Sequence, residues 1–199
     1  MKKTISVILS VIFIALALCS CSGPTAELTE ENVTATVDAA MTALTEFDTK
    51  ELEKYVDSQT LDFILKYANE KKQFRELGKA LFENLTYEIK DIDLENQTVT
   101  LSVRNKNLYI PALLFVQNLL KNYSTLELLQ NLKNDSWLDE NLTELTSEIG
   151  KAEMQAASVD ITLTIKQEKK NLVLGFNDDA ENNVSGGALS AIKSLFEGK

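Results

Sequence analysis

Apolar residues recur at two different spacings along this chain, and the spacing changes near residue 85. Between residues 31 and 46 they recur every three or four positions, which predicts an amphipathic helix. Asp48, with Glu51 three residues later, predicts the start of a second helix. Residues 58–84 continue the helical pattern, with a break expected near Asn69. The first apolar stripe consists of Val33, Val37, Met41 and Leu44.

Beyond this point the apolar residues occupy every second position. Residues 85–89 and 99–103 alternate on either side of a polar turn, which predicts an antiparallel hairpin. The alternation slips at residues 91–94, which indicates a β-bulge. Residues 159–165 and 172–176 alternate in the same way across another polar turn, so we expect a second hairpin.

A strongly apolar segment lies between the two expected hairpins. Residues 109–120 hold nine apolar side chains in twelve positions, and Pro111 favours a helix start there. The segment is either a buried helix or an exposed patch for a protein partner or a lipid. It is too short to span a bilayer. Further helices are expected from Ser124 and from Ser136, the latter ending at Gly150.

The last part of the chain is expected to contain an acidic loop at 178–181, a turn at 185–187 and a short helix that includes Leu195. We expect Gly187 to hold a positive φ, which glycine adopts at little cost. The order of elements predicts an α+β fold: N-terminal helices packed on a curved antiparallel sheet of two hairpins, with a helical insertion at about 108–156.

The first twenty-one residues predict export and anchoring. Lys2 and Lys3 precede an apolar run over residues 5–18, which as a helix would span about 21 Å against a hydrocarbon core of roughly 30 Å. The run is therefore expected to be a signal peptide. Leu18-Cys19-Ser20-Cys21 resembles the lipobox of bacterial lipoproteins, which implies lipid attachment at Cys21 and a position on the extracytoplasmic face of the cell membrane. Acylation at Cys19, or a plain secretory signal, is the alternative.

The remainder divides into an expected polar tether at residues 22–32 and a single domain at 33–199. The full chain carries a net charge of −10 and no histidine, and both cysteines lie within the first 21 residues. Such a charge disfavours nucleic acid as a partner. The missing histidines and cysteines exclude a zinc site built on them in the domain, and we expect no metal and no cofactor.

Four segments carry a resemblance to a known family: 85–89, 99–107, 158–165 and 184–189. They are similar to small lipoproteins of Gram-positive bacteria whose domain belongs to a family without an assigned function. The resemblance covers about residues 33–197, and the Ser-Gly-Gly turn is its sharpest motif. It implies a cystatin-like or nuclear transport factor two-like fold, in which a curved sheet wraps a long helix, and it implies no activity.

Three functions remain open. The first is a non-enzymatic domain that binds a small apolar ligand or a partner, with Tyr87, Phe176 and Trp137 as candidate lining residues or plain core. The second is a structural role beside an integral membrane protein, suggested by residues 109–120. The third is an acid–base isomerase or dehydratase that uses Asp and Tyr, for which the inward strand positions offer no carboxylate.

Overall fold

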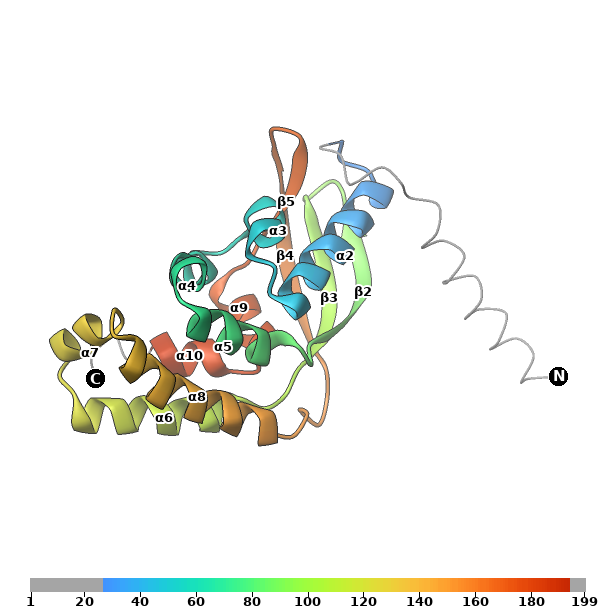
Figure 1. Ribbon diagram of the computed structural model, residues 1–199. Coiled ribbons are helices and arrows are strands. Elements are labelled where there is room, and N and C mark those ends of the chain that lie inside the picture. Colours follow the sequence, from blue (N-terminus) through green and yellow to red (C-terminus); the bar gives the residue numbers. More distant parts are fainter. Residues whose placement is uncertain (1–26, 194–199) are drawn as a thin grey trace.

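A computed structural model of the chain describes residues 27–193 and shows an α+β protein with a mixed sheet (Figure 1). The predicted fold class is confirmed at this level. The elements, in chain order, are α2 Glu30–Glu46, α3 Thr49–Tyr55, β1 Val56–Asp57, α4 Gln59–Glu70, α5 Lys72–Phe82, β2 Thr86–Asp93, β3 Thr98–Arg104, α6 Tyr109–Asn122, α7 Thr125–Asn131, α8 Asp135–Lys151, β4 Val159–Glu168, β5 Asn171–Gly175, α9 Asp178–Val184 and α10 Ala188–Lys193.

The five described strands form one sheet in the order β1-β5-β4-β3-β2. β2 with β3, β3 with β4 and β4 with β5 are antiparallel, whereas β1 runs parallel to β5. The register of β2 against β3 shifts between Ile89 and Asp91, where the sequence predicts a bulge. β1 has two residues, too few for a period of two to be recognised in the sequence.

α2 packs against the sheet and covers its apolar face (Figure 1). Thr29 caps its first turn, and Phe47 ends it in the left-handed conformation. Val33, Val37 and Met41 are fully buried at this interface, as are Leu101 and Leu163 on the sheet side. Helix and sheet together form a dense apolar core.

α3 and α9 also pack on strands, whereas α4, α5, α6, α8 and α10 surround an apolar space beside the sheet. α5 packs on α8, and α6 packs on α10. Pro111 lies in the first turn of α6, as expected, and Ser124 with Glu127 forms a full capping box at the start of α7. None of the described helices is long and apolar enough to cross a bilayer.

The apolar segment at 109–120 is neither wholly buried nor wholly exposed. Ala112, Val116 and Leu119 face the interior, while Ile110 and Leu114 on the opposite side of α6 are exposed. The two readings of the sequence therefore apply to two faces of one helix.

Two further differences concern the ends of the domain. α2 begins at Glu30, so the last three residues of the expected tether are helical. The expected loop at 178–181 is wrong: these residues form the start of α9, because Asn177 caps it and acidic side chains suit the positive end of a helix. Cys21 and Leu195 lie outside the described residues.

Candidate ligand-binding site

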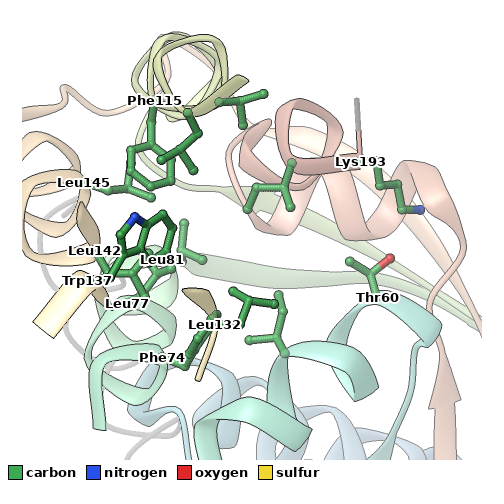
Figure 2. A pocket seen from close by; sticks show the side chains of 14 residues that line it. Thr60, Phe74, Leu77, Leu81, Phe115, Leu132, Trp137, Leu142, Leu145 and Lys193 are labelled. Carbon is green, nitrogen blue, oxygen red and sulfur yellow. The ribbon is translucent and has the colours of Figure 1, made fainter. Parts of the chain in front are cut away.

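An apolar pocket of about 330 Å³ lies among α4, α5, α6, α8 and α10 (Figure 2). Its walls are mostly leucine and aromatic side chains, including Leu77, Leu81, Phe115, Trp137 and Leu145. No strand and no residue of α2 contributes to its lining. Small-molecule sites occupy roughly 300–1,000 Å³ and are predominantly apolar, so the volume and chemistry suit a small apolar ligand.

The pocket forms where the apolar stripes of several helices converge. α5 contributes Phe74, Leu77 and Leu81 at helical spacing, and α6 contributes Val116 and Leu119. α5 packs on α8 and α6 packs on α10, and the pocket lies between these two helix pairs.

Trp137 is held in the wall by the start of α8. The side chain of Asn134 accepts a hydrogen bond from the Trp137 backbone N–H at 3.3 Å and caps this helix. The ring of Tyr123 meets the indole edge-to-face, with centroids 5.6 Å apart. In Figure 2 the indole nitrogen turns towards Leu145 and Phe115, two other lining residues.

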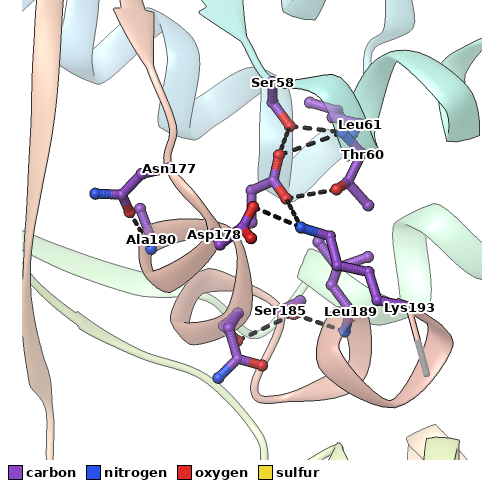
Figure 3. Close-up of polar contacts among 11 residues, drawn as sticks. Ser58, Thr60, Leu61, Asn177, Asp178, Ala180, Ser185, Leu189 and Lys193 are labelled. Carbon is purple, nitrogen blue, oxygen red and sulfur yellow. Dashed lines mark hydrogen bonds and ion pairs between the residues drawn. The ribbon is translucent and has the colours of Figure 1, made fainter. Parts of the chain in front are cut away.

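One end of the pocket is bordered by two polar residues, Thr60 of α4 and Lys193 of α10. Their polar atoms are engaged outside the pocket by Glu181 of α9 (Figure 3). The Thr60 hydroxyl donates to Glu181 Oε2 at 2.5 Å, and Lys193 Nζ lies 3.2 Å from the same oxygen. Thr60 and Lys193 therefore line the pocket with their carbon atoms.

Glu181 is almost fully buried, yet both oxygens of its carboxylate have partners. Ser58 Oγ donates to Oε1 at 2.5 Å, and the Thr60 backbone N–H donates to the same oxygen at 3.3 Å. Ser58 also caps α4 by accepting from the Leu61 N–H. The carboxylate thus joins the start of α4 to the end of α10, and it complements the positive end of α4.

The protonation states in this network are fixed around neutral pH. Burial alone would raise the pKa of the Glu181 carboxyl, but hydrogen bonds from Ser58, Thr60 and Lys193 together lower it below its ordinary value. The hydrogen bond to Asp178 raises the pKa of Lys193. Groups held in this way do not exchange protons readily at neutral pH, so the network suits a structural clamp.

Of the three predicted lining residues, only Trp137 lies in the wall of this pocket. Tyr87 lies on β2, where its hydroxyl donates to Asp38 Oδ1 of α2 at 2.7 Å. Burial, followed by this hydrogen bond, raises the pKa of Tyr87 above its ordinary value, so the phenol stays protonated. Asp38 is exposed, and neither residue lines the apolar pocket, so this Asp–Tyr pair forms no enclosed acid–base centre there.

Phe176 lies in a different place again. It follows β5, is half-buried, and borders a polar groove of about 550 Å³ with Asp57, Thr164 and Lys166. Lys166 pairs with Asp57 across that groove at 2.5 Å. The three aromatic residues therefore belong to separate surfaces and do not form one site.

Sequence reasoning missed the Glu181 network and most of the pocket lining. Ser58 and Glu181 are far apart in the chain, and no local pattern pairs them. One signal was available: Asn177 followed by three acidic residues is a helix-start pattern, which would have placed Glu181 on a helix. The leucines of the pocket have the same spacing as core leucines, so the pattern cannot separate the two.

Comparisons with protein-family models, with curated proteins and with solved structures found no match to this chain.

Proposed function

We propose that this protein is a lipoprotein held by Cys21 on the extracytoplasmic face of the cell membrane, and that its domain binds a small apolar ligand without catalysing a reaction. The apolar pocket among the helices is the observation that carries the ligand-binding part. Its lining offers hydrocarbon and aromatic surface, and the bordering charges are engaged with one another.

The anchor rests on the sequence. The basic start, the short apolar run and the four residues before and including Cys21 fit a lipoprotein signal. One acyl chain binds a membrane only marginally, whereas the two or three chains of a lipoprotein cysteine hold a protein stably. We further propose that α2 lying across the sheet reflects the curved-sheet arrangement of the cystatin-like folds.

The anchor is tested by cell fractionation of two cysteine variants of the full chain. Cys21→Ser should lose the lipid and leave the membrane fraction. Cys19→Ser is the matched control and should stay anchored. Retention of the Cys21→Ser chain, or release of the Cys19→Ser chain alone, contradicts attachment at Cys21.

Ligand binding is tested by thermal unfolding of the full chain carrying Cys21→Ser, with α-methylstyrene as the probe. A ligand at ten times its dissociation constant stabilises the folded state by about 1.4 kcal/mol, which raises Tm by roughly 4 °C. Leu145→Phe should place a ring in the pocket and reduce the shift, while Leu114→Phe on the exposed side of α6 should preserve it. An unchanged Tm at saturating probe contradicts the proposal.

A second candidate function is docking to an integral membrane protein. The outer faces of α6 and α7 expose Ile110, Leu114, Leu126 and Leu129. Residues 105–134 carry three lysines and one acid, in contrast to the acidic chain as a whole. A photo-crosslinking residue at position 114 in cells should capture an identified membrane-embedded protein, and the same residue at position 79 on α5 should not. Equal capture at both positions counts against docking.

A further inference from the structure

One hydrogen-bond donor in the pocket wall is buried without an acceptor. Trp137 is 8% exposed, and its indole Nε1–H has no hydrogen-bond acceptor among the described residues. The indole N–H only donates, and buried tryptophans usually place it against an oxygen. Leaving such a group unpaired in an apolar interior is costly, so it calls for a physical explanation.

The position of this donor distinguishes it from the other buried polar atoms that lack a hydrogen-bond partner. Gln73 Oε1 and Asn182 Oδ1 are also buried without a partner among the described residues, but neither residue lines the pocket. Trp137 does, and its nitrogen faces Leu145 and Phe115 across the lining (Figure 2). The edge-to-face contact with Tyr123 supplies at most a weak interaction for the N–H.

The other polar residues at the pocket offer no competing donor. The Thr60 hydroxyl and the Lys193 ammonium are both directed at Glu181, and Lys193 Nζ also lies 2.6 Å from Asp178 Oδ1. Two acids face one lysine at that end, so an anionic group on a ligand would be repelled there. The chemistry of the pocket is therefore a hydrocarbon surface with a single neutral donor.

We propose that the ligand is an uncharged, mainly hydrocarbon molecule with one hydrogen-bond acceptor, such as a ketone, ester or ether oxygen, which accepts from Trp137 Nε1–H. This proposal rests on the proposed function, and it adds which class of ligand the pocket selects. Apolar walls give affinity for the hydrocarbon part of the ligand, and the indole N–H sets its orientation. In such pockets a small number of well-placed polar groups commonly has this role.

Two probes of the same shape separate this proposal from apolar binding alone. Acetophenone carries a carbonyl where α-methylstyrene carries a methylene group. Trp137 is the only tryptophan of the chain, so its indole N–H gives a single signal in a ¹H–¹⁵N NMR spectrum of the full chain carrying Cys21→Ser. Acetophenone should move the indole proton downfield, while α-methylstyrene should bind without that downfield shift.

Trp137→Phe supplies the matched variant. It removes the N–H and keeps an aromatic ring, and any change of pocket shape affects both probes alike. The ratio of the acetophenone affinity to the α-methylstyrene affinity should fall about fivefold, the contribution of a typical net hydrogen bond. An unchanged ratio, or the same indole shift with both probes, overturns the role of Trp137 and leaves apolar binding intact. Binding of neither probe overturns both.

Discussion

The sheet half and the helical half of this domain are built from the same kinds of apolar residue, yet the apolar pocket lies in the helical half, whereas the groove beside β4 and β5 is polar. At the interface of α2 with the sheet, Met41, Leu101 and Leu163 are fully buried. Among α5, α6 and α8, residues such as Leu145 and Trp137 are nearly as buried but line a space of about 330 Å³.

The difference lies in how the elements meet. A sheet offers a continuous surface with regular strand spacing, which one helix can cover closely. Helices that pack as pairs at an angle have no such continuous surface between the pairs. Apolar composition alone therefore does not separate a core from a binding pocket, and the geometry of the elements does.

The largest loss of stability is expected from truncating a leucine, and the same truncation can be compared in each half. Leu163→Ala should lower the free energy of unfolding by about 4 kcal/mol, because a closely packed site leaves a full cavity. Leu145→Ala should cost about 2 kcal/mol, since that side chain already borders space. Chemical denaturation measures both, and equal losses would remove the distinction between the halves.

The turn before α10 packs against the segment that precedes α6, where the Leu108 N–H donates to the carbonyl oxygen of Gly186. Gly186 has φ of 60°, and an added Cβ would fall on the carbonyl oxygen of Lys106. Gly186→Ala should therefore destabilise the fold by about 3 kcal/mol. Gly187 has φ of 90°, which confirms the positive φ expected from the sequence.

A helix glycine provides the control for this turn. Gly150 lies in α8, and an added Cβ there meets nothing within 4 Å. Gly150→Ala should stabilise the fold by about 0.5–1 kcal/mol. Urea unfolding of both variants checks the pair, and a harmless Gly186→Ala would show that the turn is not constrained as described.

At the polar end of the pocket, Glu181→Gln should cost about 2 kcal/mol at pH 7, because charged hydrogen bonds from Ser58, Thr60 and Lys193 are weakened. The folded-state pKa of Glu181 is lowered from an ordinary value of 4.5. The stabilisation by the ionised carboxylate is thus fully present above about pH 4.5 and disappears as the pH falls through the folded-state pKa.

Unfolding curves of the natural chain and of Glu181→Gln between pH 3 and pH 7 test this sign. Their difference in stability should shrink towards acid pH. A difference that grows as the pH falls would mean that folding raises the pKa of the Glu181 carboxyl instead of lowering it.

The sequence predicted the regular elements well and the pocket poorly, for physical reasons. Periodicity located α2, the two antiparallel strand pairs and the helices between them, because one buried face imposes a repeat on each element. The parallel strand β1 was too short to show a repeat, and Glu181 was misplaced because a run of acids was taken for a loop.

Among the candidate lining residues, Trp137 lies in the pocket wall, while Tyr87 and Phe176 lie elsewhere. An aromatic residue at an inward position marks burial, and burial does not say which neighbours it meets. Those neighbours are set by contacts between distant helices, which the pattern of one chain does not record.

The smallest expected effect comes from enlarging a side chain. Leu145→Phe should change the free energy of unfolding by less than about 0.5 kcal/mol because the pocket accommodates the ring, while Leu163→Phe should cost about 2 kcal/mol by overpacking. Thermal unfolding monitors both variants. A loss at Leu145 as large as that at Leu163 would indicate that the helical half is closely packed.

Diffraction from crystals of the full chain carrying Cys21→Ser, pressurised with xenon, tests the pocket most directly, because xenon enters accessible apolar cavities. We expect xenon among Leu77, Trp137 and Leu145. Side chains closed over that space, with xenon absent from it, would show that the helices enclose no apolar pocket.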